Sequence, residues 1–434
     1  MMNTAPLKVA VLGCGVVGTE VVRRLHTSGP ALAGRIGAPV ELVGIAVRDT
    51  RRRRDLDVDP GLWTDDPLAL VKRGDIDIVV ELLGGTEPAR ALAVAAMEHG
   101  AGVVSANKAL LAEHGPLLHE TAAVHGVDLL YEASVAGAVP LLRPLRDSLG
   151  GDRITRIVGI VNGTTNYVLD RMTETGGGFA AALHEAVDHG YAEADPTADV
   201  EGLDAAAKAV ILASLAFHTR VPPTAVHREG ITEVTAVDVA DARDLGRVVK
   251  LVTVLERAVG QDDVLLRVHP AMVARAHPLA DVRGADNAVL VEAADAGPLL
   301  FRGAGAGGVP TSSAVLGDLV TAARRRVLGH RGAAPQAAVK QTASVAGPRS
   351  RHHLRVPVTD AATALDDVAA VLRSGGVGIG TVHRRRAAGQ EALVLLTKDT
   401  DDATLRTALE AVAALPCVSA APRSMRLLDA EEGR

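Results

Sequence analysis

The chain has 434 residues, of which 48% are apolar, 23% are charged and 2% are aromatic. At roughly 150 residues per domain, this length predicts about three domains. The apolar fraction excludes a chain that is disordered over most of its length. The formal net charge of −6 gives no attraction to nucleic acid or to an anionic membrane surface, and the few aromatic side chains cannot build base-stacking platforms.

Cysteine usage and the N-terminal residues bear on the cellular compartment. Cys14 and Cys417 are too few for a disulfide framework or a zinc cluster. Residues 1–11 lack a basic region followed by a long apolar stretch. No apolar run reaches the roughly 20 uninterrupted residues of a membrane-spanning helix. We therefore expect a cytoplasmic protein with neither a membrane nor a nucleic-acid partner.

The first 150 residues alternate between strand-like and helix-like segments. This rhythm predicts crossover connections and a doubly wound parallel sheet with helices on both faces. A Gly- and Pro-containing insertion, residues 27–39, delays the second strand. We expect strands at residues 7–12, 40–47, 76–83, 103–106 and 127–131, and helices at residues 19–26, 88–99 and 109–125.

Residues 151–310 predict an α+β domain whose sheet carries helices on one face. We expect strands at residues 154–161, 264–268 and 289–292, and helices at residues 167–173, 179–189 and 200–217. A helix at residues 311–326, in the segment 311–330, is expected to return to the first domain. This second domain is expected to hold the substrate and to form a subunit interface.

A linker at residues 331–351, rich in Gly, Ala, Pro, Gln and Ser, precedes the last segment. Residues 352–434 predict the β-α-β-β-α-β order of the ferredoxin-like superfold. The expected strands are residues 354–358, 377–383, 392–397 and 418–421, and the expected helices are residues 363–372 and 403–415.

A glycine-rich loop follows the first strand and opens a helix. In the sequence Gly13-Cys-Gly15-Val16-Val17-Gly18, the first glycine permits a tight turn, the second admits a pyrophosphate and the third lets helix and strand pack closely. This pattern predicts a Rossmann-like domain that binds a nicotinamide dinucleotide. The alternative is a glycine-rich turn without a ligand.

The end of the second strand bears on the choice of cofactor. Arg48 near the ribose favours a 2′-phosphate and hence NADP, whereas Asp49 favours NAD. The arginines at 51–54 either add positive field there or form a solvated loop. We favour NADP and keep NAD as the alternative.

Two lysines and several carboxylates are the candidate catalytic groups. Asp204 and Lys208 are four residues apart and share one helix face, which continues with apolar residues. A lysine on such a face is costly to bury unless it is paired or functional. A second lysine, Lys108, lies just past the carboxyl end of a strand, where open α/β sheets bind ligands. The alternative is an ordinary surface ion pair and a solvated lysine.

The sequence resembles the homoserine dehydrogenase family, in its long, single-function bacterial type. The most specific stretch runs from Gly190-Tyr-Ala-Glu-Ala-Asp-Pro to Lys208. The other stretches are Ser105-Ala-Asn-Lys108, Tyr131-Glu-Ala-Ser-Val-Ala-Gly137, Asn162-Gly-Thr-Thr-Asn166 and Gly303-Ala-Gly-Ala-Gly-Gly-Val-Pro-Thr311. The resemblance implies reversible, nicotinamide-dependent reduction of L-aspartate 4-semialdehyde to L-homoserine, a step towards threonine, methionine and isoleucine.

The resemblance also implies the roles of single residues. Lys208 is the acid/base, and Lys108 polarises or orients the substrate near the nicotinamide. The implied substrate-binding residues are Glu193, Asp204, Asp199 and Thr164. Gly190 and Gly307 are implied cofactor contacts from the second domain.

Three further expectations come with the family. Glu132, together with the backbone carbonyls of Val135, Gly137 and Val139, matches a structural monovalent-cation site, for which sodium is the expected ion; the alternative is a buried glutamate at a strand end. The C-terminal segment resembles an ACT domain, which implies L-threonine as an allosteric ligand. A homo-oligomer, either a dimer or a tetramer, is also implied.

Two rival functions remain open at this point. One is another nicotinamide dehydrogenase acting on a hydroxy acid, which would need an arginine and a histidine–carboxylate pair around the second domain. His269 and His277, each before a proline, are the suggestive histidines. The other is an amino-acid-sensing regulator that keeps an inactive dehydrogenase body.

Overall fold

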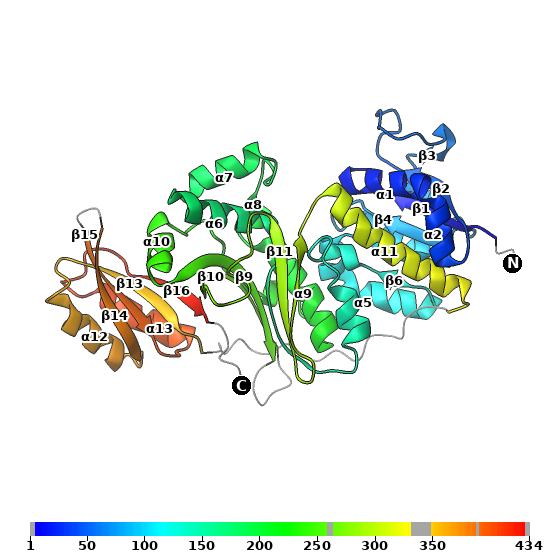
Figure 1. Cartoon of the computed structure of the whole chain (residues 1–434). Coiled ribbons are helices and arrows are strands. Elements are labelled where there is room, and N and C mark those ends of the chain that lie inside the picture. The colour runs from blue at the N-terminus through cyan, green and yellow to red at the C-terminus, as the bar shows by residue number, and fades with distance from the viewer. Residues whose placement is uncertain (1–4, 258–263, 331–348, 388–389, 430–434) are drawn as a thin grey trace.

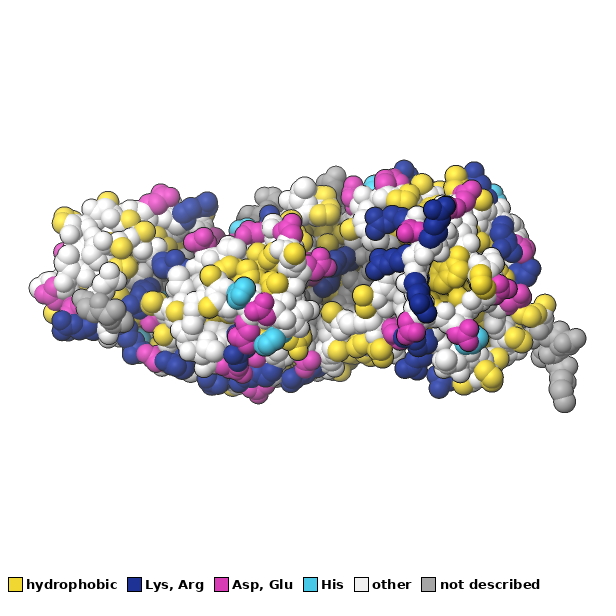
Figure 2. Space-filling model, turned by 90° about the horizontal axis from the view of Figure 1, so that it is seen from above, with side chains coloured by type: hydrophobic (Ala, Val, Ile, Leu, Met, Phe, Trp, Pro, Cys, Tyr) yellow, Lys and Arg dark blue, Asp and Glu magenta, His cyan; other side chains and the backbone are white. Residues whose placement is uncertain are grey.

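The computed structural model describes residues 5–257, 264–330, 349–387 and 390–429. The described residues form an N-terminal, a middle and a C-terminal unit, which lie in an elongated row (Figure 1). Seen from above, Lys and Arg side chains gather over the N-terminal unit at the right of the row (Figure 2). No helix in these residues is long and apolar enough to cross a membrane.

The N-terminal unit is built on a six-stranded sheet whose paired strands are all parallel, in the order β3-β2-β1-β4-β5-β6. This strand order belongs to dinucleotide-binding α/β folds. The strands are β1 (Leu7–Leu12), β2 (Val40–Ala46), β3 (Trp63–Thr64), β4 (Ile78–Glu81), β5 (Gly102–Ser105) and β6 (Leu129–Leu130). Its helices are α1 (Val16–Thr27), α2 (Gly29–Ile36), η1 (Pro60–Leu62), α3 (Pro67–Val71), α4 (Ala89–Glu98) and α5 (Lys108–His125).

The segment 27–39, expected to be an insertion, contains the helix α2. Pro30 stands in its first turn, where a missing N–H costs nothing, and Gly37 ends it in a left-handed conformation with φ 92°. Leu32 and Ile36 are four residues apart and bury one face of the helix against the core. Glycine and proline are typical of loops, so the sequence did not predict this short helix.

A long helix late in the chain completes the N-terminal unit. Helix α11 (Gly308–Val327) packs against α1 and α2 and contacts β4 and β5. Val315 and Leu319 are fully buried in the same core cluster as Val9 and Val11 of β1. Arg325 forms an ion pair with Asp128, with 2.9 Å between Nη1 and Oδ1, close to β6.

The middle unit is a mixed sheet of β7 (Ile154–Ile160), β8 (His227–Arg228), β9 (Arg247–Arg257), β10 (Val264–Ala274), β11 (Asp286–Ala293) and β12 (Gly297–Ala304). Helices α6 (Gly163–Thr175), α9 (Leu203–Phe217) and α10 (Ala236–Asp244) contact β9. The remaining helical segments are η2 (Glu132–Ser134), η3 (Pro144–Ser148), α7 (Phe179–Asp188), α8 (Thr197–Val200) and η4 (Pro223–Ala225).

The single helix expected at residues 200–217 is divided in two. Gly202 adopts a left-handed conformation, φ 75°, and stands between α8 and α9. A Cβ at this position would lie 3.2 Å from Val268 Cγ1, so the backbone also passes close to β10. The break lets α9 begin afresh at Leu203, with Asp204 in its first turn.

The C-terminal unit contains β13 (His352–Val358), α12 (Ala364–Ser374), β14 (Ile379–Ala387), β15 (Gln390–Thr397), α13 (Asp402–Ala413) and β16 (Arg423–Leu428). The last strand was expected at residues 418–421, and this prediction is wrong. Val418 makes only an isolated bridge to Val358, and the strand follows Pro422. Most of the linker, residues 331–348, lies outside the described residues.

The last strand joins the C-terminal unit to the middle unit. Strand β16 pairs antiparallel with β13 and parallel with β10, so one continuous sheet passes through both units. Buried Arg355 of β13 donates to both carboxylate oxygens of Asp241 in α10, at 2.9 and 2.8 Å. The C-terminal unit is therefore attached by backbone pairing and by a buried charge pair.

Candidate active site

The glycine-rich loop after β1 has the shape that a dinucleotide needs. A Cβ on Gly13, whose φ is 95°, would lie 2.6 Å from Leu82 O, and a Cβ on Gly18 would lie 2.2 Å from Gly13 O. By contrast, a Cβ on Gly15 would meet no atom within 4 Å. Helix α1 begins at Val16 without a side-chain cap, so its first amides remain open to an anion.

A second helix N-terminus lies beside this loop. Helix α11 starts after Gly307, also without a side-chain cap. A Cβ on Gly308 would lie 2.8 Å from Cγ1 of Val16, so the two helix starts touch. Two helix N-termini at one edge of the sheet favour a pyrophosphate, because both present unpaired amides and the positive ends of their dipoles. Gly190, the other glycine expected at the cofactor, follows the end of α7 in the middle unit.

Arg48 and Asp49, the two residues that bear on the choice of cofactor, follow the end of β2 and differ in their contacts. Asp49 accepts the backbone amide of Arg51 at 2.8 Å, so one of its oxygens is engaged within the loop. Arg48 is exposed. Arg54 lies over the ring of Trp63 at 5.0 Å from the centroid.

Asp204 brings the two candidate lysines together. Lys208, one turn further along α9, donates from Nζ to Asp204 Oδ2 and to Val161 O, both at 2.6 Å. Lys108, the first residue of α5, forms an ion pair with Asp204 Oδ1. A carboxylate of the middle unit thus binds one lysine from each unit.

The surroundings of the two lysines differ. Lys208 is 8% exposed, and its pKa is lowered, first by burial and also by the charge of Lys108, although Asp204 opposes the shift. The Lys108 side chain is 47% exposed; burial lowers its pKa, but the charge of Asp204, with smaller contributions from Asp199 and Glu193, raises it overall. Of the two lysines, Lys208 is therefore the one whose neutral amine forms at the lower pH.

The pKa of Asp204 is lowered as well, but for a different reason. Burial alone would raise it, but the charges of Lys208 and Lys108 together outweigh burial, and the pKa is lowered. Asp204 is therefore ionised while both lysines surround it. A buried carboxylate with two ammonium partners is a stable way to hold these amines in place.

The other residues predicted for the substrate lie around this carboxylate. Asn162 donates from Nδ2 to Asp199 Oδ1 at 2.6 Å and to Asp204 Oδ2 at 2.8 Å. Thr164 donates to the carbonyl of Tyr191 at 2.7 Å, which ties the start of α6 to the loop that carries Glu193. Glu193 itself is exposed. The amide of Asn162 is the one group here to which sequence reasoning assigned no role.

Glu81, a buried glutamate that sequence reasoning did not identify, holds the segment that precedes Lys108 through Ser105 and Asn107. Glu81 ends the apolar strand β4, is fully buried, and accepts from Ser105 Oγ at 2.6 Å and from the Leu83 amide at 2.8 Å. Burial raises its pKa. Asn107 caps α5 and donates to Gly85 O at 2.6 Å. An acidic residue ending an Ile-Val-Val strand was the available signal.

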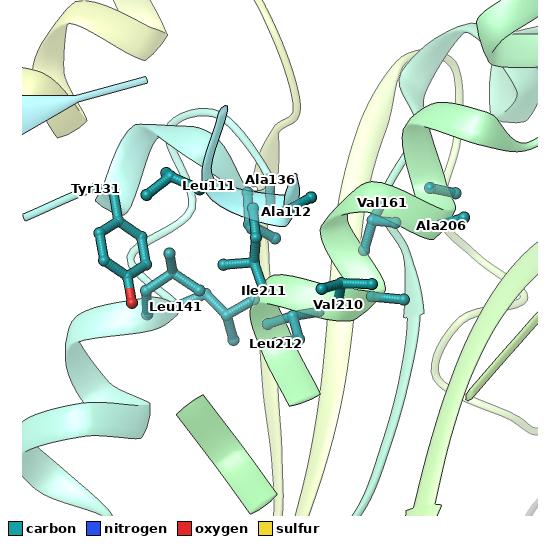
Figure 3. Close-up of a cluster of buried hydrophobic side chains, with 14 of the residues drawn as sticks. Leu111, Ala112, Tyr131, Ala136, Leu141, Val161, Ala206, Val210, Ile211 and Leu212 are labelled. Atoms are coloured by element: carbon teal, nitrogen blue, oxygen red, sulfur yellow. The ribbon is translucent and has the colours of Figure 1, made fainter. Parts of the chain in front are cut away.

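An apolar cluster holds α5 and α9 together beneath the lysines. Figure 3 shows Leu111 and Ala112 of α5 close to Val210 and Ile211 of α9. These side chains are buried and belong to one core cluster that joins the N-terminal and middle units. The packing keeps the starts of the two helices, and therefore both amines, near Asp204.

At the predicted cation site, the carboxylate of Glu132 is already engaged by backbone amides of the protein. The Glu132 carboxylate accepts the amides of Leu141, Leu142 and Arg143 at 2.6, 2.8 and 2.8 Å. Among the described residues, no group of three or more His, Cys, Asp or Glu side chains could hold a metal ion. A hard cation here would therefore depend on the backbone carbonyls of Val135, Gly137 and Val139.

The histidines that a hydroxy-acid dehydrogenase would need lie away from the lysines. His269 is buried on β10, and burial, with the charges of Arg426 and Arg267, lowers its pKa to about 3. His277 is buried in the turn after β10. Neither belongs to the group around Asp204.

Comparisons with known proteins identify the family of this chain. A family model described as homoserine dehydrogenase, NAD binding domain, matches residues 13–132, and the homoserine dehydrogenase model matches residues 140–320. The homoserine dehydrogenase of Mycobacterium tuberculosis (strain ATCC 25618 / H37Rv) is 48% identical over 97% of this chain and 98% of its own length. That of Corynebacterium glutamicum is 45% identical over 96% and 95%.

Solved structures give the same result. The crystal structure of a homoserine dehydrogenase from Thiobacillus denitrificans is 36% identical and covers 98% of this chain and 99% of its own, with a TM-score of 0.91. A hyperthermophilic archaeal homoserine dehydrogenase in complex with NADPH is 25% identical over 73% of this chain and 98% of its own, with a TM-score of 0.62. The chain belongs to the homoserine dehydrogenase family, whose members are NAD(P)-dependent oxidoreductases that act on a CH–OH group.

Proposed function

We propose that the chain reduces L-aspartate 4-semialdehyde reversibly to L-homoserine, with Lys208 as the acid/base. The observation that carries the proposal is the buried Lys208 amine, held by Asp204 opposite Lys108. The nicotinamide cofactor supplies the hydride in reduction and accepts it in oxidation. The loop of Gly13, Gly15, Val16, Val17 and Gly18 binds its pyrophosphate, with Gly307 contributing from the start of α11.

The lysines handle the charge that develops on the substrate oxygen. As the carbonyl carbon is reduced, protonated Lys208 gives a proton to the oxygen, and in the reverse direction the neutral amine removes it. Lys108, with its raised pKa, stays charged and stabilises the alkoxide. Glu193 and Asp199 attract the ammonium group of the substrate, and Thr164 and Asn162 hold the loop and the carboxylates in place.

NADP is the proposed cofactor. Arg48 is exposed just past the end of β2, and we propose that it binds the 2′-phosphate, whereas Asp49 is engaged with the amide of Arg51. Steady-state rates of L-homoserine oxidation with NADP⁺ and NAD⁺ test the preference. Arg48→Ala should lower the affinity for NADP⁺ and leave that for NAD⁺ unchanged. An equal loss with both cofactors would contradict this role for Arg48.

We propose a monovalent cation, sodium, at the carbonyls of Val135, Gly137 and Val139. Ala136 and Gly137 both have positive φ, 57° and 59°, a conformation that a bound cation would help to hold. The melting temperature of the whole chain should rise more with added sodium than with tetramethylammonium at equal ionic strength. Equal curves in the two salts would show that no such ion is bound.

The C-terminal unit is proposed to be an ACT-like regulatory domain that binds L-threonine. Its β-α-β-β-α-β order and its direct pairing with β10 support this assignment. Inhibition by L-threonine, with D-threonine as the matched control, tests it.

We also propose a homo-oligomer, a dimer or a tetramer, because β12 is an edge strand with Leu300 exposed. Light scattering after gel filtration gives the number of subunits. We also propose a cytoplasmic location for the enzyme.

A further inference from the structure

A polar cavity lies on one face of the continuous sheet, where the middle and C-terminal units meet. It has a volume of about 200 Å³ and is lined from both units, by Arg156, Arg267 and His269 on one side and by Arg349, Ser350 and Arg426 on the other. The cavity shares no lining residue with the group around Asp204. It is therefore a separate site.

The strand register explains why these side chains converge. Arg267 and His269 are two residues apart on β10 and point to the same face of the sheet. Arg426 of β16 pairs with Ala271, which lies on that same face of β10. The parallel pairing of β10 with β16 thus aligns positive groups from two units.

Several buried polar atoms in this lining have no hydrogen-bond partner among the residues that the structure describes. They are Nε and Nη1 of Arg267, Nε2 of His269, Nε of Arg426 and Oγ of Ser350. Arg267 and His269 are only 6% and 3% exposed. Buried polar groups are almost always paired, so five such atoms in the lining of one cavity favour a ligand-binding site here.

The charges identify the class of that ligand. Five arginines and three carboxylates line the cavity, which leaves an excess of positive charge. Arg267 has only a distant carboxylate, with 4.0 Å between its Nη2 and Glu256 Oε2, and burial lowers its pKa. Arg426 is bound to Glu229 and Asp402 through its two terminal nitrogens, and its buried Nε has no partner among the described residues.

His269 requires a ligand that donates a hydrogen bond to its Nε2 atom. Its Nδ1 lies 3.1 Å from Pro270 O and must carry the proton, since a carbonyl only accepts. Burial, with the charges of Arg426 and Arg267, lowers the pKa of His269 to about 3, so the ring is neutral and Nε2 is an acceptor. A ligand that satisfies both Arg267 and His269 has oxygens that accept and one O–H that donates.

We propose that this cavity binds hydrogen phosphate, with Arg267, Arg426 and Ser350 donating to its oxygens and His269 Nε2 accepting from its hydroxyl. Its volume suits one such ion with a few waters. Sulfate has similar shape and charge but no hydroxyl at neutral pH, so it lacks the partner for His269. The ion would bridge β10 and β16, and so link the middle and C-terminal units.

Calorimetric titration of the whole chain with inorganic phosphate tests the proposal. Saturating NADP⁺ is present throughout, so that the loop at residues 13–18 cannot take up phosphate. We expect one saturable site that prefers phosphate to sulfate at equal ionic strength. Arg267→Met should weaken phosphate binding by about tenfold or more, and His269→Phe should abolish the preference over sulfate. Arg302→Gln, which changes an exposed arginine paired with Asp286, is the matched control.

Thermal unfolding gives a second readout that does not depend on activity. Removing an underpaired buried charge relieves its desolvation, so Arg267→Met should unfold at a higher temperature than the wild type without phosphate. The same variant should lose the rise in melting temperature that phosphate gives the wild type. The proposal is overturned if the wild-type chain shows no saturable binding, or if Arg267→Met, folded and active, binds phosphate as the wild type does.

Discussion

Lys108 and Lys208 bind opposite oxygens of the same carboxylate, that of Asp204. One lysine starts α5 in the N-terminal unit, and the other lies on α9 in the middle unit. The two units must therefore be packed together before the site is complete. This relationship governs the predictions for the reaction.

Replacing Lys208 should remove most of the turnover. Lys208→Ala deletes the proton donor, and proton transfer by a positioned group contributes roughly 10²–10⁴-fold to a rate. We expect kcat for L-homoserine oxidation to fall by about that factor, while the Kd for NADP⁺, measured by fluorescence, stays near the wild-type value. Lys72→Ala, which changes an exposed lysine at the end of α3, should behave as the wild type. A kcat for Lys208→Ala within about threefold of wild type would show that Lys208 is not the acid/base.

The pH dependence should differ between the two directions. Burial lowers the pKa of Lys208, so the neutral amine forms at a lower pH than it would for a free lysine. Oxidation uses the neutral amine and should speed up as pH rises through this pKa, whereas reduction uses the ammonium form and should slow down. Asp204→Asn removes the charge that supports the ammonium form, so both profiles should shift to lower pH. Profiles of kcat in the two directions measure this, and an unshifted variant would contradict the coupling.

Glu81 should affect catalysis through the position of Lys108. Glu81→Ala leaves the hydroxyl of Ser105 and the amide of Leu83 without their buried acceptor, which costs about 1–3 kcal/mol. We expect a lower urea midpoint and a lower kcat. Glu81→Gln keeps a carbonyl acceptor and should recover most of the kcat. Glu113→Gln, on the exposed side of α5, is the control. If Glu81→Ala loses stability but keeps the full kcat, the residue supports the fold alone.

Substitutions at two glycines of the dinucleotide loop should distinguish an effect on folding from an effect on cofactor binding. Gly15→Ala meets no protein atom, so it should keep the wild-type melting temperature and lose affinity for NADP⁺ by roughly tenfold. Gly13→Ala forces a Cβ against Leu82 O at a positive φ and should destabilise the fold by about 1–3 kcal/mol. Melting curves together with cofactor titration distinguish the two effects. Gly74→Ala, where a Cβ also meets nothing, controls for the added methyl group.

The buried pair between Arg355 and Asp241 should determine how firmly the C-terminal unit is attached. Arg355→Met leaves Asp241 with His353 as its remaining ion-pair partner and should cost about 3–5 kcal/mol of unfolding free energy. The loss should be visible as a lower urea midpoint at pH 7. Arg373→Met, near the end of α12 and exposed, is the control. Equal midpoints for the two variants would show that the pair is not needed for attachment.

The predictions from the sequence were best where a local pattern determined the element. Strand β1 lies at Leu7–Leu12, as expected, because an apolar run followed by glycine has few other conformations. Strand β9, which contains Lys250, was not predicted. That lysine is buried because Nζ donates to Asn166 Oδ1 at 2.9 Å and to Val282 O at 2.6 Å, partners that lie far away in the sequence.

By itself the sequence determined the glycine loop, the four-residue spacing of Asp204 and Lys208 and the family, because these depend on residue types at fixed separations. The tertiary structure alone decided that Lys108 pairs with Asp204, that Glu81 holds the segment before Lys108 and that β16 pairs with β10. Each of these relationships links segments separated by long stretches of chain, and packing rather than local preference brings such segments together. The arginines around the polar cavity show the same dependence, because their strands become neighbours only after the sheet has formed.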